Sequence, residues 1–361
     1  MGSIKMKSIF SQDRITLARS IAQQFGDLKS SLRAEVIYRE IYKKSSSSPT
    51  PFFGLSEEVK RWLNESYTFE YPIEIIDLDS SKQDGSVKFI MRLKRDGRLV
   101  ESVLIPELGR LTQCISTQVG CAQACRFCQT GRMGLARNLD TDEIIGQIIE
   151  AERWRQENST HETAKYERIT NVVYMGMGEP LDNLDNVIES THILCDNKGL
   201  NFSPNKVTIS TVGLLPQLEK VLTSTKVAVA LSLHSPYNSE RSKIMPVNNR
   251  HSLTDVVEVL RKHSQQGSRR SFMIQYTLLR GINDTSAHAS ELIALLEGIS
   301  VKINLIPLNE HEGASYRRPD LGRVFAFQQE LKKAGMVATV RLSKGRDIQA
   351  ACGQLIKDKV K

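Results

Sequence analysis

Three cysteines lie close together in the segment 120–131, at Cys121, Cys125 and Cys128. Their spacing, C-x₃-C-x₂-C, supplies three thiolates, one fewer than the set that fully ligates most iron–sulfur clusters. Three thiolates on a cluster of four irons leave one iron open to an outside ligand, which suits a site of chemistry. The alternative is a structural zinc site that takes Cys114 or a distant residue as its fourth ligand. Zinc ligands, however, usually come as two separate C-x₂-C pairs.

The composition of the chain indicates an intracellular protein with an acidic partner. Six cysteines at irregular spacing in 361 residues do not indicate a secreted disulfide scaffold. The chain has 49 Lys and Arg against 41 Asp and Glu, and its net charge of +8 favours a partner such as nucleic acid. No stretch is long and apolar enough for a membrane span, and the N-terminus lacks the apolar core of a signal peptide. We therefore expect a cytoplasmic protein with no membrane partner.

The pattern of apolar residues changes partway along the chain. The first part predicts a small α+β module, with helices at 11–25, 32–42 and 57–67 and strands at 73–79, 87–94 and 98–105. After about Leu111, strands and helices alternate regularly. The expected strands are 112–116, 171–175, 206–211, 227–233, 272–278 and 302–306; the expected helices between them are 141–156, 183–196, 214–222, 253–266 and 287–296. A last helix at 321–334 precedes a strand at 337–341. This alternation predicts a parallel sheet, as a barrel, a partial barrel or an open doubly wound sheet.

Polar residues stand at the ends of five of these strands. The first strand leads into the cysteine loop. The groups at the ends of the other four strands are Gly176–Pro180, the pair Ser210 and Thr211, Ser232–His234, and Pro307–Asn309. In a parallel α/β barrel, active sites gather at the carboxyl ends of the strands. We therefore expect these groups to converge on one ligand.

Several motifs carry a resemblance to a known family. The cysteine loop, with Phe127 at its aromatic position, is similar to that of the radical S-adenosylmethionine (SAM) superfamily. Gly176-Met-Gly-Glu-Pro180 resembles the glycine-rich strand end of that superfamily. The remaining motifs resemble the RlmN/Cfr family of adenine methyltransferases, and they are 112–121, 175–183, 232–236, 244–246 and 347–355. The resemblance covers roughly residues 100–356.

The resemblance implies an α/β fold, a partial parallel (β/α)6 barrel of the radical SAM type. The radical SAM core is expected over residues 107–343. A small N-terminal accessory domain over residues 1–95 is expected to dock RNA. A C-terminal segment, residues 344–361, carries Cys352.

The resemblance also implies two cofactors and their contacts. A 4Fe–4S cluster is expected on Cys121, Cys125 and Cys128, with its open iron chelated by the amino and carboxylate groups of SAM. Residues at the strand ends are expected to contact SAM: Gly178, Glu179, Ser210, Ser232, Leu233, His234 and Asn309.

The implied reaction uses two further cysteines. Adenine C2 offers no nucleophile to the SAM sulfonium, and the family instead carries the methyl group on a cysteine. Cys352 takes a methyl group from one SAM. A second SAM, cleaved at the cluster, supplies the radical that removes a hydrogen from this S-methyl group, and the resulting carbon radical adds to adenine. Glu101 matches the acceptor of the C2 proton, and Cys114 attacks the sulfur of Cys352, forming a transient disulfide that releases the base. Without the resemblance, Cys352 reads as a core cysteine and Glu101 as a solvated carboxylate.

The expected substrates are an adenosine in the peptidyl-transferase region of 23S rRNA and the adenosine next to the anticodon in some tRNAs. An external electron donor of the flavodoxin type is usual for the family. One alternative is C8 methylation of the same rRNA adenosine, giving antibiotic resistance. His-Ser-Pro-Tyr at 234–237 resembles those relatives, whereas Val119 and Pro180 resemble the C2-methylating majority. Another alternative is a non-catalytic, metal-stabilised RNA-binding module.

Basic residues near the motifs fit an RNA substrate. We expect many of them on the rim of the active site, where phosphates would pass. They are Arg132, Arg137, Arg241, Lys243, Arg250, Arg317, Arg318, Arg341, Lys344 and Arg346. Lys344-Gly345 stands where the family often has arginine and glycine.

Overall fold

A ten-stranded sheet runs through the computed structural model, which describes residues 6–26, 29–43, 52, 54–158, 161–265, 270–310, 313 and 315–355. The strand order is β14-β13-β12-β11-β10-β9-β6-β5-β4-β3. These strands are β3 (Ile73–Ser80), β4 (Val87–Leu93), β5 (Leu99–Glu107), β6 (Arg110–Cys114), β9 (Asn171–Tyr174), β10 (Val207–Thr211), β11 (Ala228–Ser232), β12 (Phe272–Leu278), β13 (Lys302–Pro307) and β14 (Val337–Val340). The last six residues of the predicted C-terminal segment, 356–361, lie outside the described residues.

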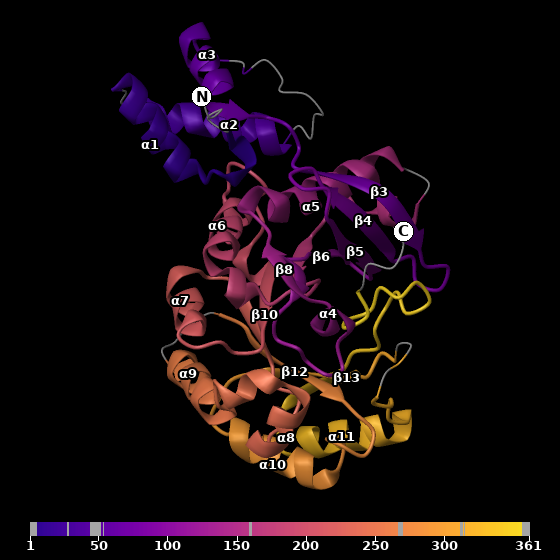
Figure 1. Ribbon diagram of the computed structural model, residues 1–361. Helices are drawn as coiled ribbons and strands as arrows, with labels where there is room; N and C mark the ends of the chain where they lie inside the picture. The colour runs from indigo at the N-terminus through magenta and orange to yellow at the C-terminus, as the bar shows by residue number, and fades with distance from the viewer. Residues whose placement is uncertain are drawn as a thin grey trace.

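Strand β6 and strands β9 to β14 are parallel, and each lies beside the next of them in chain order. Each connection carries a helix: α5 (Thr141–Glu157), α6 (Leu184–Cys195), α7 (Gln217–Ser224), α8 (Asn238–Ile244) with α9 (Leu253–Gln265), α10 (Ser286–Leu296) and α11 (Leu321–Lys333). Right-handed crossovers between successive neighbours put every helix on the same face of the sheet. Figure 1 shows α6, α7, α9 and α10 following one another along the outside of the molecule.

This winding confirms the predicted α/β class and its six βα units. It also decides between the architectures that the sequence left open. A doubly wound sheet reverses its strand order partway, and this sheet does not. The two edges, β14 and β3, are not paired with each other, so the sheet stays open. One face of the parallel strands is therefore covered by helices, and the other is left to line a site.

Helix α5 illustrates how the sequence sets these elements. Asp140 and Glu143 form a capping box at its start, in which each side chain satisfies a backbone N–H of the other residue. Ile144, Ile145 and Ile148 are buried, because the spacing of three and four residues puts them on one face. Among the helices of the described ranges, none has both the length and the apolar character that crossing a membrane requires.

The N-terminal helices dock on the outside of the sheet domain. They are α1 (Arg14–Phe25), α2 (Ser30–Lys43) and α3 (Glu57–Ser66), and two short strands, β1 (Lys7–Ser8) and β2 (Tyr67–Thr68), pair between them. Arg14 donates to Asp196 at 2.8 Å, and Lys198 forms an ion pair with Glu35 at 2.9 Å. Figure 1 shows this helical group at the end of the molecule nearest α5 and α6.

Strands β3 and β4 belong to the large sheet and not to this helical group. Both lie within the predicted 1–95 module, but they continue the sheet of the core through antiparallel pairing with β5, which in turn pairs with β6. Burial of most of β4 and β5 shows that this part of the sheet is interior.

The C-terminal segment leaves edge strand β14 and reaches the turn between β3 and β4. Gly345 N–H donates to Asp84 at 2.8 Å, and Ser81 Oγ donates to Asp347 at 2.8 Å. Lys344 donates to the carbonyl of Pro106 on β5. The segment thus connects the two sides of an open sheet, and it places Cys352 over the strand ends.

A hairpin that the sequence did not predict carries the cysteine loop. Strands β7 (Gln118–Cys121) and β8 (Gly134–Asn138) pair antiparallel, and the short helix α4 (Gln129–Arg132) lies between them. At Gly120 the backbone has φ of +82°, and a Cβ there would lie 1.9 Å from the carbonyl oxygen of Gly134. Only glycine permits this approach, so Gly120 sets the position of Cys121.

Replacing Gly120 tests this constraint. We expect Gly120→Ala to lower the free energy of unfolding by more than Gly109→Ala, because Gly109 shares a positive φ of +76° but has open space around its Cβ position. Left-handed backbone alone costs about 1–2 kcal/mol for a non-glycine residue, so the excess in Gly120→Ala measures the clash. Urea denaturation gives both values. Equal losses in the two variants would contradict the close approach.

Candidate active site

One cavity of about 150 Å³ lies at the carboxyl ends of the parallel strands. It is lined by the cysteine triplet and by residues from the ends of β9, β10, β11 and β13. Its lining includes Cys121, Cys125, Cys128, Gly178, Glu179, Ser210, Ser232, His234, Asn309 and Cys352. The strand-end residues that the sequence singled out therefore do converge. Leu233 is the exception, since it is buried behind the cavity and does not line it.

The three thiols of the loop share a buried environment. Burial raises the pKa of Cys121 to about 12 and raises the pKa of Cys125 and Cys128 as well. Thiolates at these positions therefore need a positive partner in the same place. In the described part of the chain, no three His, Cys, Asp or Glu side chains are arranged around a single metal ion.

Two glycines let the strand end after β9 approach the cysteine hairpin. A Cβ at Gly176 would lie 2.7 Å from the carbonyl oxygen of Ile115, and one at Gly178 would lie 2.6 Å from the side chain of Gln118. Gln118 Oε1 also accepts the N–H of Glu179 at 2.8 Å. These contacts bind the glycine-rich turn to the hairpin that carries the cysteines.

Glu179 is almost fully buried and joins two strand ends. Its carboxylate accepts the N–H of Leu181 at 3.0 Å and the N–H of Val212, after β10, at 3.0 Å. Burial raises the pKa of this carboxyl to about 7, although the hydrogen bonds from Thr211, Leu181 and Val212 oppose the rise. The group is therefore poised to change its charge near neutral pH.

His234 has a strained backbone and a neutral ring. Its φ of +59° lies in the left-handed region, which turns the chain sharply after β11. Nδ1 accepts the N–H of Thr277 at 2.9 Å, which leaves the proton on Nε2. Burial lowers the pKa of the ring to about 3, so it stays uncharged. The ring of Phe127 packs edge-on against the ring of His234, with 4.9 Å between the ring centroids. The cysteine loop therefore contacts the turn after β11 directly.

One atom of the Asn309 side-chain amide is hydrogen-bonded, and the other has no hydrogen-bond partner among the described residues. Its Nδ2 donates to Ser343 Oγ at 2.9 Å and to the carbonyl of Cys352 at 3.1 Å. Its Oδ1 is buried and meets no hydrogen-bond donor among the described residues. Because buried acceptors are rarely left unpaired, this oxygen indicates a ligand donor in the cavity.

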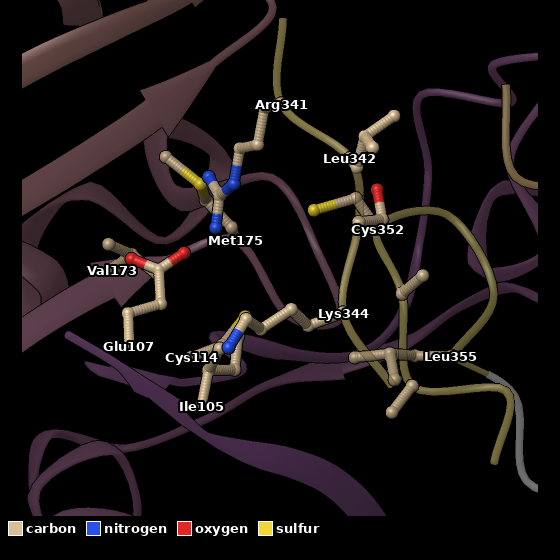
Figure 2. Close-up of a pocket in the computed structure, with 13 residues that line it drawn as sticks. Ile105, Glu107, Cys114, Val173, Met175, Arg341, Leu342, Lys344, Cys352 and Leu355 are labelled. Carbon is tan, nitrogen blue, oxygen red and sulfur yellow. The ribbon is translucent and has the colours of Figure 1, made fainter. Parts of the chain in front are cut away.

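Cys352 also lines a second, smaller cavity of about 20 Å³, together with Cys114. Figure 2 shows Cys114 entering from the strand side and Cys352 from the C-terminal segment, with its sulfur pointing inward. Both thiols are free. Burial, and then the nearby Cys352, raise the pKa of Cys114, whereas Arg341 lowers it. Arg341, Lys344 and Glu107 line the same space, so this cavity has two cationic side chains and one carboxylate in its wall.

Comparison with known proteins agrees with this geometry. A model of the radical SAM superfamily matches residues 115–293. A protein named "Dual-specificity RNA methyltransferase RlmN" from Campylobacter jejuni is 38% identical, covering 95% of this chain and 98% of its own length. A relative of the same name from Desulfotalea psychrophila is 39% identical, covering 98% and 95%.

The chain belongs to the RlmN family of radical SAM RNA methyltransferases.

A solved structure extends the similarity to the fold. The crystal structure of a radical SAM methyltransferase from Sphaerobacter thermophilus superposes with a TM-score of 0.86 at 33% identity, covering 98% of this chain and all of the other. The enzymes of this family use a 4Fe–4S cluster and SAM, and those are the cofactors of this chain.

The residues of the larger cavity fit these cofactors. Three thiols, that of the buried Cys125 and those of the half-buried Cys121 and Cys128, offer the donor set of a cluster with one open iron, and each cysteine of such a cluster binds a different iron. That explains why the triplet need not surround a single ion. The unpaired Oδ1 of Asn309 and the raised pKa of Glu179 mark two polar groups in the same cavity that a cationic ligand such as SAM can satisfy.

Glu101 lies apart from both cavities. It is buried on β5, and its carboxylate forms an ion pair with Lys88 at 3.6 Å. It is not among the residues that line either space. Its backbone carbonyl accepts Ser116 Oγ at 2.6 Å, so Glu101 stands next to the start of the cysteine hairpin.

Sequence reasoning missed Gln275 and, besides Leu233, misplaced Arg241. Gln275, in the middle of β12, lines the larger cavity and accepts from Ser210 Oγ at 3.2 Å. A polar residue within an apolar strand was the signal that could have revealed it. Arg241, expected on the rim among RNA-binding residues, is instead fully buried, so that expectation was wrong. Arg137, from the same set, is paired with Asp96 and Glu143.

The charge of Glu179 makes stability depend on pH. Its folded pKa of about 7 lies above the ordinary 4.5, so the folded state binds the proton more tightly. Protonation of Glu179 therefore adds roughly 3 kcal/mol to the free energy of unfolding below pH 4.5, and this contribution is lost as the pH rises to 7. We expect Glu179→Gln to flatten the decline of unfolding free energy across this window, in urea titrations of cofactor-free protein.

The surface variant Glu162→Gln is the control for this measurement, because Glu162 is exposed beside Lys165. Part of the slope should remain in Glu179→Gln, since burial also raises the pKa of Glu189 to about 7. An unchanged slope would contradict the raised pKa of Glu179.

Proposed function

We propose that this RlmN-family enzyme methylates C2 of an adenosine in the peptidyl-transferase region of 23S rRNA, and of the adenosine next to the anticodon in some tRNAs. The observation that carries the proposal is the position of Cys352, which lines the cavity of the cysteine triplet and also the cavity of Cys114. A cysteine that carries a methyl group must receive it in one place and be freed from the methylated RNA in another. A single side chain at the boundary of two cavities meets that need.

The cluster is proposed to sit on Cys121, Cys125 and Cys128, with SAM held by the strand-end residues. When bound, these cofactors supply the methyl group and the radical that activates it. The residues of the protein position these cofactors and exclude water from them. Gly176 and Gly178 allow close approach of the backbone, the uncharged His234 offers an Nε2 proton, and Asn309 offers a free carbonyl oxygen.

Cys352 is proposed as the nucleophile that becomes S-methylcysteine. Adenine C2 carries no lone pair that attacks a sulfonium, whereas a thiolate does. Asn309 holds the backbone of Cys352 at 3.1 Å, and Gln129 N–H, next to the cluster ligand Cys128, donates to the carbonyl of Gly353 at 2.9 Å. These bonds fix the carrier segment against both sides of the larger cavity.

Cys114 is proposed to resolve the covalent RNA adduct by attacking the sulfur of Cys352. Its thiol is disfavoured as an anion by burial, and the positive charge of Arg341 partly offsets this effect. Glu101 is proposed as the acceptor of the C2 proton. It shares a face of the sheet with Cys114, because Val103 pairs with Cys114 and Glu101 lies two residues before Val103 on β5.

The RNA is proposed to approach over the basic residues of the C-terminal segment, Arg341 and Lys344, which line the smaller cavity. An adenine within folded RNA has to leave its stack to reach a buried site. The N-terminal helices are proposed as an RNA-docking element, and the electron donor as a flavodoxin-type protein in the cytoplasm.

Mass spectrometry of RNA from a deletion strain tests the regiochemistry. We expect 2-methyladenosine to disappear from 23S rRNA and from the affected tRNAs, and to return on complementation with the wild-type gene but not with Cys352→Ala. Loss of 8-methyladenosine with 2-methyladenosine intact would instead establish the C8 reaction. Stoichiometric zinc, with no brown chromophore after anaerobic reconstitution, would point to a non-catalytic RNA-binding module.

Removing Cys114 tests the release step. We expect Cys114→Ala to accumulate a covalent RNA adduct through Cys352, with multiple turnover lost by at least about a hundredfold. Denaturing gels followed by nuclease digestion and peptide mass spectrometry identify the linkage. The matched control is Cys195→Ala, a half-buried cysteine that lines neither cavity and should leave turnover intact. Free methylated RNA from Cys114→Ala would refute the resolving role.

A further inference from the structure

Arg241, in α8, is a fully buried cation with neutral partners. Nε donates to the carbonyl of Leu233 at 3.0 Å, and Nη1 donates to Asn248 Oδ1 at 2.8 Å. Nη2 donates to the carbonyls of Val212 at 2.7 Å and Ser232 at 3.1 Å. Its four acceptors in the part of the chain that the structure describes are neutral oxygens, and none of them belongs to a carboxylate. A guanidinium held only by neutral oxygens, at zero exposure, is a charge without a counter-ion.

Such an arrangement carries a large desolvation cost unless a negative group lies nearby. Burial lowers the pKa of Arg241 to about 10, and the group that opposes this fall is Cys125. The influence is mutual, since burial and the neighbouring thiols Cys128 and Cys121 raise the pKa of Cys125 while Arg241 lowers it. The guanidinium and the thiol of Cys125 therefore influence each other electrostatically.

The backbone holds the two elements together. The N–H of Arg126, which follows Cys125, donates to the carbonyl of Ile244 at the end of α8 at 3.0 Å. The N–H of Met245 donates to the carbonyl of Arg241 at 2.7 Å, and Met245 lines the larger cavity. Helix α8 is thus attached to the cysteine loop, and the position of Arg241 relative to it is fixed.

We propose that Arg241 is the counter-ion of the iron–sulfur cluster and raises its reduction potential. The inference rests on the proposed ligation of the cluster by Cys121, Cys125 and Cys128. A cluster held by thiolates becomes more negative when it takes up an electron, and net charge around a cluster is one of the factors that set its potential. A buried positive charge beside Cys125 stabilises the reduced state more than the oxidised state, because the low-dielectric interior screens it weakly.

Arg241 also has a structural role, and the experiment must separate it from the electrostatic role. Its carbonyl partners lie at the ends of β10 and β11, so its loss loosens the turn that holds His234. Arg270 is a matched control. It donates to the carbonyls of Val227, Leu222 and Thr225, at the opposite ends of the strands. Arg270→Gln therefore removes a comparable set of carbonyl bonds far from the cysteine loop.

The experiment is a redox titration of the reconstituted holoenzyme, with the reduced cluster followed by electron paramagnetic resonance and iron content measured for each variant. We expect Arg241→Gln to shift the midpoint potential to more negative values. Arg241→Lys, which keeps the charge but not the fork of donors, should stay near wild type, and so should Arg270→Gln. A potential unchanged in Arg241→Gln, or shifted equally in Arg270→Gln, would overturn the proposal.

A second variant covers the case in which Arg241→Gln does not fold. Asn248→Asp leaves the guanidinium in place and gives it a carboxylate at the 2.8 Å position of Asn248 Oδ1. Neutralising the charge in this way should also shift the potential to more negative values, and an unshifted potential at full iron content refutes the inference. Failure of the wild-type protein to take up a 4Fe–4S cluster would refute the proposed ligation instead, so the two failures are distinguishable.

Discussion

The carboxyl ends of the parallel strands impose the constraint on which the rest of the site depends. Backbone groups at these ends have lost their ladder partners, yet they are buried, so they need other hydrogen-bond partners. Buried side chains supply them: Glu179 accepts from Val212, Arg241 donates to three carbonyls, and His234 accepts from Thr277. Asn283 closes the same turn by donating to the carbonyls of His234 and Thr277. The cavity exists because side chains, rather than further strand, satisfy these groups.

The open sheet is the second condition for the proposed chemistry. Because β14 and β3 do not pair, the chain after β14 is free to cross the strand ends and attach to the turn between β3 and β4. That path brings Cys352 within reach of two cavities at once. A closed barrel would have used the same edges for backbone pairing and left no such route. Cys114 ends β6, the strand where the parallel and antiparallel parts of the sheet join, and there it lines the smaller cavity together with Cys352.

Periodicity and spacing predicted much of the fold. The six βα units, the strands β3 to β5 and the N-terminal helices all follow from local patterns of apolar residues, and the structure confirms them. The hairpin of β7 and β8 did not follow, because its strands are short and depend on a glycine–glycine approach between Gly120 and Gly134. Arg241 was misplaced for a related reason. Charge predicts exposure, whereas the burial of this cation depends on how the turn after β11, the 3₁₀ turn after α8 and Val212, 29 residues earlier in the chain, fold around it.

The amino-acid sequence by itself determined the chemistry that is available: a compact cysteine triplet, polar groups at successive strand ends, and two cysteines outside the triplet. These are properties of residue type and short spacing, which do not depend on folding. Only the tertiary structure decided which of them meet. It placed Cys352 at the boundary of two cavities, set Glu101 away from both, and buried Arg241 in α8, the helix whose last residue is hydrogen-bonded to the cysteine loop. Those outcomes depend on contacts between segments as much as 266 residues apart, such as Ser81 with Asp347, and such contacts form only when the sheet brings its two edges under one C-terminal segment.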